Sequence, residues 1–297
     1  MVVKEALVGF GPLALAQWRV LGTAVIYLAY FLASGRVRRL RLSPRGWLLM
    51  AATSLCGVTL NQLFIIDGLA LSSVGHTGLI VALGPVMVLV IAVLVRMESL
   101  TTWKMAGMLV SFGGVGMLAV DKTAGGNGTH WRGDLLLLAG TTVFAVYVVL
   151  MKDLANRCDP LTLNTLIFVL GAMMLAPFCA RALAATPWSR LRLEAWWELV
   201  FMVVFGSVLP YSLFAYALTG LAASRVAAFN YLQPVIASSL AIWLLSERLT
   251  AHVLIGGTLV LAGVYLIERE RGNEIPMERK ENENHGNQTF ALHDADR

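Results

Sequence analysis

The chain contains a series of apolar stretches, each approaching or exceeding the length needed to cross a lipid bilayer. A membrane-spanning helix needs about 20 mostly apolar residues. Nine segments fit this description: Leu13–Ala33, Trp47–Leu71, Gly75–Val95, Trp103–Val120, Gly133–Met151, Leu161–Leu183, Trp196–Leu218, Ala222–Leu245 and His252–Ile267. The runs are too long for barrel strands and do not alternate between apolar and polar residues. The sequence therefore predicts an all-α integral membrane protein.

The composition agrees with a bilayer as the solvent. Hydrophobic residues make up 58% of the 297 residues and charged residues only 14%, whereas a soluble domain carries about 25% charged residues. The formal net charge is +5, but the basic residues lie between the apolar runs instead of forming a stripe. A nucleic-acid partner is therefore not expected, and the expected partners are the lipid bilayer and a small-molecule substrate.

The second half of the chain repeats the first at an offset of 149 residues. Between Pro85 and Leu118, nine of 34 positions are identical to the positions 149 residues later, without a gap. The identities include Pro85 with Pro234, Glu98 with Glu247, and Gly107 with Gly256. Shared apolar composition does not easily align proline, glutamate and glycine in register. We therefore predict an internal duplication.

The duplication divides the chain into three parts. We expect a first repeat over residues 1–121, a second over 132–268, and a disordered, solvated cytoplasmic tail over 269–297. Five helices per repeat is an odd number, so the second repeat would enter the membrane from the opposite side. Inverted repeats of this kind occur in secondary transporters, with the substrate site at the interface between the repeats.

The start of the chain lacks a counterpart to one helix of the second repeat. Gly133–Met151 forms a full apolar run before Lys152, whereas only three residues precede the matched Lys4. By this offset about fifteen to eighteen apolar residues are missing. We therefore expect a truncated first helix and nine full spans, or alternatively a natural nine-helix variant.

These features resemble the EamA family of the drug/metabolite transporter superfamily. The residues that carry the resemblance are Pro12 and Arg19, and the pattern Pro-x12-Glu-x-Leu-Thr-x5-Gly, which occurs twice. The resemblance covers Met1 to about Ile267 and implies ten helices, transport of a small metabolite or drug, usually export, and no chemical step. It does not choose a substrate or an oligomeric state, and a homodimer remains open.

The distribution of lysine and arginine predicts the orientation in the inner membrane. Fourteen basic residues fall on the side of the Arg36–Arg45 loop or in the adjoining tail, and seven on the other. Because cytoplasmic loops are enriched in these residues, the Arg36–Arg45 loop and the C-terminus are expected in the cytoplasm.

Two charged residues inside the apolar runs are candidate functional groups. Arg19 lies about 10 Å along its helix from Pro12, where it could bind a substrate carboxylate; the alternative is an arginine that snorkels to the interface. Asp67 could carry a coupling proton, because burial raises the pKa of a carboxyl. Its alternative is an interfacial, solvated aspartate.

Uncharged polar residues extend the predicted substrate site. Asn230 and Gln233 share a helix face directly before Pro234, and Ser212 and Tyr216 share another; each pair could instead make interhelical hydrogen bonds. Asn61, on a different face from Asp67, and Tyr147, an aromatic lining residue, complete the candidates.

The matched glutamates Glu98 and Glu247 follow apolar runs and precede Leu-Thr. We interpret them as loop and helix-start residues, since a carboxylate near a helix N-terminus is stabilised by the helix dipole.

No catalytic or metal-binding pattern is present in the sequence. The three cysteines have no CxxC spacing, and the five histidines lie in the tail or at the edges of runs, without an HExxH motif. We expect neither a cofactor nor a metal. An intramembrane enzyme and a non-transporting scaffold are the alternative functions.

Overall fold

The computed structural model describes residues 9–35, 43–72, 74–120, 131–156, 158–186, 191–233, 235–236 and 251–269. Residues 270–297 of the predicted tail, Glu247, and residues 234 and 237–245 of the Ala222–Leu245 run lie outside these residues. In the described residues every regular element is a helix. The predicted all-α architecture is therefore confirmed.

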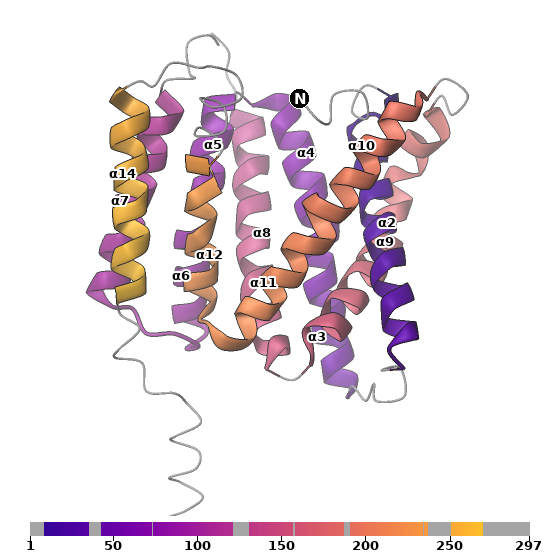
Figure 1. The fold of residues 1–297 in the computed structure, drawn as a ribbon, viewed down its shortest axis with the longest axis horizontal. Coiled ribbons are helices and arrows are strands. Elements are labelled where there is room, and N and C mark those ends of the chain that lie inside the picture. Colours follow the sequence, from indigo (N-terminus) through magenta and orange to yellow (C-terminus); the bar gives the residue numbers. More distant parts are fainter. Residues whose placement is uncertain are drawn as a thin grey trace, which may run out of the picture.

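The helices form a single bundle (Figure 1). They are α2 (Pro12–Ala33), α3 (Pro44–Ser54), η2 (Leu55–Leu60), α4 (Asn61–Leu71), α5 (Val74–Ala82), α6 (Gly84–Leu94), α7 (Thr102–Val120), α8 (Trp131–Ala155), α9 (Pro160–Ala185), α10 (Leu193–Val203), η4 (Val204–Val208), α11 (Leu209–Gly220), α12 (Ala223–Ala228), η5 (Phe229–Tyr231) and α14 (Ala251–Arg269). Six continuous helical stretches are long and apolar enough to cross a membrane, and Leu254–Ile267 is a shorter apolar one.

Several helices begin where proline and a capping residue predict a start. Ser43 accepts a hydrogen bond from the Gly46 N–H, and Asp159 accepts one from the Thr162 N–H. A proline follows each cap, and its fixed φ suits the first helical position. Helix α2 also begins with proline, after Gly11, whose φ of 74° is one that glycine adopts without strain.

Helices α7 and α14 lie side by side, at the left of Figure 1, and run in opposite directions. Gly107 faces Gly263, whereas Gly114, farther along α7, faces Gly256. A Cβ at Gly107 would come within 2.6 Å of the Gly263 carbonyl oxygen, so the backbones can approach this closely only because both residues lack side chains.

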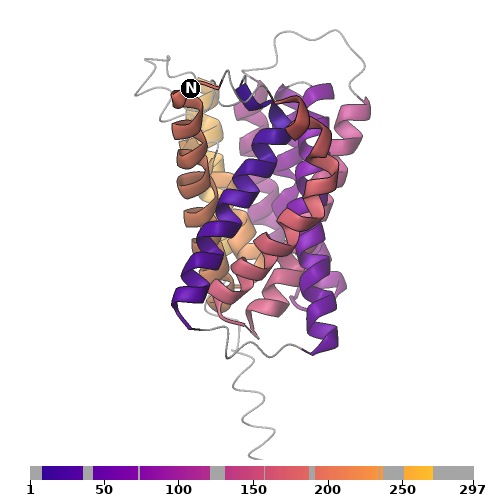
Figure 2. The same cartoon turned by 90° about the vertical axis from the view of Figure 1, so that its right-hand side faces the viewer.

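Two further antiparallel pairs form the rest of the core. Helix α2 packs along α9 (Figure 2), where the Gln17 Nε2 donates to the Ala172 carbonyl at 3.2 Å. Helix α8, in the centre of Figure 1, packs along α4, and the Asn61 Nδ2 donates to the Gly140 carbonyl at 3.2 Å. The largest buried apolar cluster contains residues of α2, α8 and α9, together with residues of α3, η2, α6, α11 and α12.

The structure departs from uninterrupted helices at places that the apolar pattern did not indicate. The Trp47–Leu71 run contains the π-helical segment η2, and the Trp196–Leu218 run contains η4. The Gly75–Val95 run is broken at Leu83, directly before Gly84-Pro85. Hydropathy does not report such breaks, because the residues on both sides remain apolar.

The boundaries of several elements recur at the offset found in the sequence. Segments η2 and η4 begin at Leu55 and Val204, and helices α7 and α14 begin at Thr102 and Ala251, in both cases 149 residues apart. Ser111 and Val260, also 149 residues apart, are joined by a hydrogen bond from the serine hydroxyl to the valine carbonyl.

Candidate functional site

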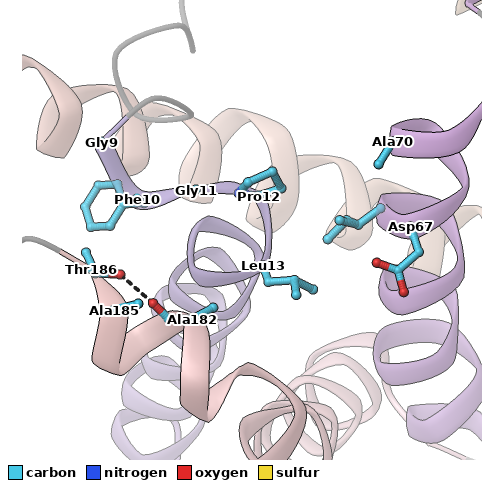
Figure 3. A pocket seen from close by; sticks show the side chains of 11 residues that line it. Gly9, Phe10, Gly11, Pro12, Leu13, Asp67, Ala70, Ala182, Ala185 and Thr186 are labelled. Carbon is cyan, nitrogen blue, oxygen red and sulfur yellow. Dashed lines mark hydrogen bonds between the residues drawn. The ribbon is translucent and has the colours of Figure 1, made fainter.

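A pocket of about 490 Å³ lies between the beginning of α2, the second half of α4 and the end of α9 (Figure 3). Gly9 to Leu13 form one wall, and Ala182, Ala185 and Thr186 form another. The Thr186 hydroxyl is bound to the Ala182 carbonyl at 2.9 Å. The end of the bundle that contains this pocket is called the pocket end below.

Asp67 is the charged residue among the described residues that line this pocket. It projects from α4 on the side opposite Pro12 and Leu13, and protein covers little of it. The remaining wall is mostly apolar, including Ile66 and Ala70. The Asp67 side chain is therefore accessible at the pocket end.

A second polar group of residues lies in the interior of the bundle. The Tyr27 hydroxyl on α2 lies 2.8 Å from the Val208 carbonyl and 2.9 Å from the Ser212 hydroxyl. On α9, the Asn164 Nδ2 donates to the Tyr211 carbonyl at 3.0 Å. We call Tyr27, Tyr147, Asn164, Tyr211 and Ser212 the tyrosine cluster.

The π-helical segment η4 helps to form the tyrosine cluster. Val208 is its last residue, and its carbonyl accepts bonds from both Tyr27 and Ser212. A π-bulge displaces carbonyls from the regular ladder and is frequent at functional sites. Here it presents a backbone acceptor to α2.

Two polar atoms of the cluster have no hydrogen-bond partner among the described residues. They are the Tyr147 hydroxyl and the Asn164 Oδ1, and each residue is only 1% exposed. An unsatisfied buried polar group costs about 1–3 kcal/mol. Gln17, whose Oε1 is also unsatisfied, lies on α2 and is bonded to α9 through its amide nitrogen.

Aromatic rings surround the cluster. Phe168 packs edge-on against Tyr211, with centroids 4.9 Å apart, and against Tyr27 at 5.6 Å. Phe144 lies 5.5 Å from Tyr147. The arrangement can therefore offer hydrogen bonds and aromatic faces, without a formal charge, to a molecule that enters it.

The structure brings two of the predicted site residues into the tyrosine cluster, namely Tyr147 and Ser212. Arg19 is half-buried on α2, on a different face from Gln17, and Asn61 is occupied by its bond to the Gly140 carbonyl. Asp67 lines the separate pocket at the pocket end.

The remaining predicted residues lie on the outside of the protein. Tyr216 is 72% exposed, and Asn230 and Gln233 are also exposed. The i, i+4 spacing placed Ser212 and Tyr216 on one face; Ser212 contacts Tyr27 of α2, whereas Tyr216 is exposed.

Sequence reasoning missed Tyr27, Asn164 and Gln17. The available signal was the same one that identified Asn61: a polar side chain inside an apolar run. Which of these residues meet could not be read from the sequence, because Tyr27 and Ser212 are 185 residues apart. Among the described residues, no group of three or more histidines, cysteines and carboxylates could hold a metal ion.

Comparison with known proteins places the chain among membrane transporters. It is 26% identical over 269 residues to an uncharacterized transporter of Archaeoglobus fulgidus, covering 91% of this chain and 93% of that protein. It is also 26% identical over 267 residues to a probable terminal-alkyne amino-acid exporter of Streptantibioticus cattleyicolor, covering 90% and 87%.

A solved crystal structure shares the fold, with a TM-score of 0.75 at 17% identity, covering 91% of this chain and 93% of the other. The EamA-like transporter family matches residues 1–120 and 131–269, which confirms the resemblance carried by the two Pro…Glu-x-Leu-Thr patterns. The family and the named relatives are transporters, which implies a protein that does not catalyse a chemical step. The chain is therefore a multi-pass membrane protein that belongs to the EamA-like transporter family.

Proposed function

We propose that this protein is a secondary transporter that exports a small polar metabolite, of the amino-acid or related organic-acid class, or a drug, across the cytoplasmic membrane by alternating access. The observation that carries the proposal is the tyrosine cluster, in which uncharged polar groups are buried between apolar helices. Polar groups at membrane depth are costly and commonly mark a substrate path.

The opposite directions of matched helices support an inverted repeat. Helices α7 and α14 correspond at the 149-residue offset and run antiparallel to each other. Helices α2 and α9, which begin at the matched Pro12 and Pro160, are also antiparallel. In an inverted-repeat transporter the substrate site lies between the two repeats, and the tyrosine cluster joins α2 of the first with α9 and η4–α11 of the second.

The unsatisfied atoms indicate what the substrate must provide. The Asn164 Oδ1 can only accept, and the Tyr147 hydroxyl can donate or accept. A substrate with an ammonium, amide or hydroxyl group would satisfy both. The similarity to a probable terminal-alkyne amino-acid exporter favours an amino acid.

Arg19 and Asp67 are proposed to assist outside the cluster. Arg19 would attract a carboxylate, so Arg19→Lys should weaken binding of an anionic substrate, because lysine lacks the bidentate fork. Asp67 would carry the coupling proton at the pocket end, so Asp67→Asn should abolish pH-driven transport but leave substrate exchange intact. Unchanged affinity in the first variant, or unchanged pH dependence in the second, removes that residue from the mechanism.

The orientation follows from the basic residues. The end of α2 and the beginning of α3 border the Arg36–Arg45 loop, and they lie at the end of the bundle opposite the pocket end. Under the positive-inside rule this end faces the cytoplasm. Antiparallel packing on α7 also brings the end of α14 there, which supports a cytoplasmic C-terminus.

The experiment is transport by the purified protein in proteoliposomes, with radiolabelled amino acids and organic acids, with and without a pH gradient. Tyr147→Phe removes one buried hydroxyl and should slow transport about five- to tenfold, because one hydrogen bond contributes about 1 kcal/mol. Thermal stability should not fall, since the hydroxyl has no hydrogen-bond partner in the described part of the chain.

Tyr216→Phe is the matched control, because this tyrosine is 72% exposed and lies outside the cluster. It should transport like the wild type. If no tested metabolite moves, the transport proposal fails for these classes. If Tyr147→Phe transports normally, the tyrosine cluster is not the substrate site.

A further inference from the structure

The end of the bundle opposite the pocket contains a buried ion pair that the tyrosine cluster does not involve. Glu98 lies in the connection between α6 and α7, and Lys104 lies in the first turn of α7. The Lys104 Nζ is 3.2 Å from the Glu98 Oε2, and the two side chains are 1% and 7% exposed. The sequence interpretation of Glu98 as a helix-start residue explains its position but not its burial.

The Glu98 carboxylate also binds a helix from the other half of the chain. Its Oε1 accepts the Ser224 backbone N–H at 3.0 Å, and its Oε2 accepts the Ser224 hydroxyl. Ser224 lies in the first turn of α12, 126 residues from Glu98. The carboxylate therefore holds the beginning of α12 against the α6–α7 connection through two hydrogen bonds.

The two sets of bonds respond differently to a movement of α12. Glu98 and Lys104 are only six residues apart, so their ion pair can persist when the halves of the chain separate. The bonds to Ser224 would break. Burying a lone carboxylate costs several kcal/mol, but this carboxylate would keep its lysine. Release of Ser224 therefore leaves the buried Glu98 carboxylate paired with Lys104.

The neighbouring contacts indicate that this end of the bundle is closed. The Lys152 Nζ at the end of α8 donates to the Leu218 carbonyl near the end of α11 at 2.7 Å. Behind Ser224, Arg225, Val226 and Ala227 of α12 are buried. The opposite end is hollowed by the pocket that contains Asp67. The two ends thus differ in the way that a transporter open to one side requires.

We propose that Glu98 is a positioning residue that holds the cytoplasmic end of the transporter closed by binding Ser224, and that release of Ser224 opens that end. The proposal rests on the proposed transport function for its biological meaning. Its structural content, an opening at α12 controlled by Glu98, can be measured without any substrate. Failure of the proposed role of Glu98 can therefore be distinguished from failure of the proposed transport function.

The test measures the accessibility of α12 in lipid nanodiscs, where both faces of the protein meet water. Ala227, which is 1% exposed, is replaced by cysteine as the reporter, and Cys56 and Cys158 are replaced by serine. Cys179, which is 0% exposed in α9, remains as an internal control for unfolding. The rate of modification by a water-soluble maleimide is followed at both cysteines by mass spectrometry.

Glu98→Gln should raise the modification rate at position 227 by about tenfold or more, because weakening the bonds that hold a segment increases the population of its open form. Ser224→Ala, which keeps the backbone N–H, should raise it less. The rate at Cys179 should not change in either variant. Glu194→Gln is the matched control, because its pair with Arg192 is exposed, and it should behave as the wild type.

Equal increases at position 227 and Cys179 would show general destabilisation and overturn the proposal, as would unchanged rates at both. If the modification rate rises at position 227 but not at Cys179, and the proteoliposomes transport nothing, the role of Glu98 in closing this end is supported and the transport proposal fails. With an active transporter, Glu98→Gln should also slow net transport.

Discussion

Two helical faces that correspond at the 149-residue offset have different surroundings. One is formed by η2 and α4, and α8 covers it; the other is formed by η4 and α11. A Cβ at Gly57 of η2 would overlap with the ring of Tyr147 of α8. At the matched Gly206 of η4, the described residues place no atom within 4 Å of that position.

The difference continues along both helices. Gly68 of α4 faces Leu137 of α8, where an added Cβ would come within 2.7 Å of the leucine Cγ. On α11, Leu213, which matches the partly buried Phe64 at the same offset, is 60% exposed. The first face thus packs on protein, whereas the second is largely uncovered by the described residues.

This comparison shows what a sequence repeat determines and what it does not. The repeat reproduces local backbone, since η2 and η4 begin at matched positions. Packing depends on which segment lies opposite, and in the described residues α8 lies against the first face. Glycine at both Gly57 and Gly206 therefore has a packing role at only one of them.

The largest expected effect is at the contact between Gly57 and Tyr147. Gly57→Ala should lower the free energy of unfolding by about 3 kcal/mol, because the added methyl group must displace a fully buried ring. Gly206→Ala should change it by only a few tenths of a kcal/mol, in either direction. SDS titration of the purified protein in bicelles measures both. Similar losses in the two variants would contradict the difference between the faces.

An intermediate effect is expected where α8 fills the space at Gly68. Leu137 is 0% exposed, and Leu137→Ala leaves a cavity that the surrounding helices cannot fully close. We expect a loss of about 2 kcal/mol, smaller than in soluble proteins, because lipid is as apolar as the core. Leu213→Ala, on the uncovered face, should cost less than about 0.5 kcal/mol. The same titration compares them, and a larger loss at Leu213 would reverse the assignment of covered and uncovered faces.

The apolar runs predicted the helices well, because each long run must satisfy its backbone internally and bury its side chains in lipid or protein. Helices α2, α7 and α9 lie within two residues of the predicted limits. The π-helical segments were not predictable, since they depend on packing and leave hydropathy unchanged.

Of the predicted site residues, Tyr147 and Ser212 lie in the tyrosine cluster, but Tyr27 and Asn164 were overlooked. Residues such as Asn230 and Ser212 look alike in sequence, and only the neighbouring helix decides which one is buried.

The smallest expected effect concerns the hydrogen bond across the covered face. The Asn61 Nδ2 donates to the Gly140 carbonyl at 3.2 Å, between α4 and α8. Interhelical hydrogen bonds in membrane proteins contribute about 0.6 kcal/mol on average, because the separated helices find other partners. Asn61→Ala should therefore lower the free energy of unfolding by about 0.6–1 kcal/mol. Asn230→Ala, at an exposed position, should leave it unchanged within error.

Because the expected loss is small, a double-mutant cycle with Gly57→Ala is the sharper measurement. Both residues pack against α8, so a coupling energy is expected. Strict additivity would mean that the contacts of η2 and α4 with α8 form independently, and that the covered face is not one cooperative interface.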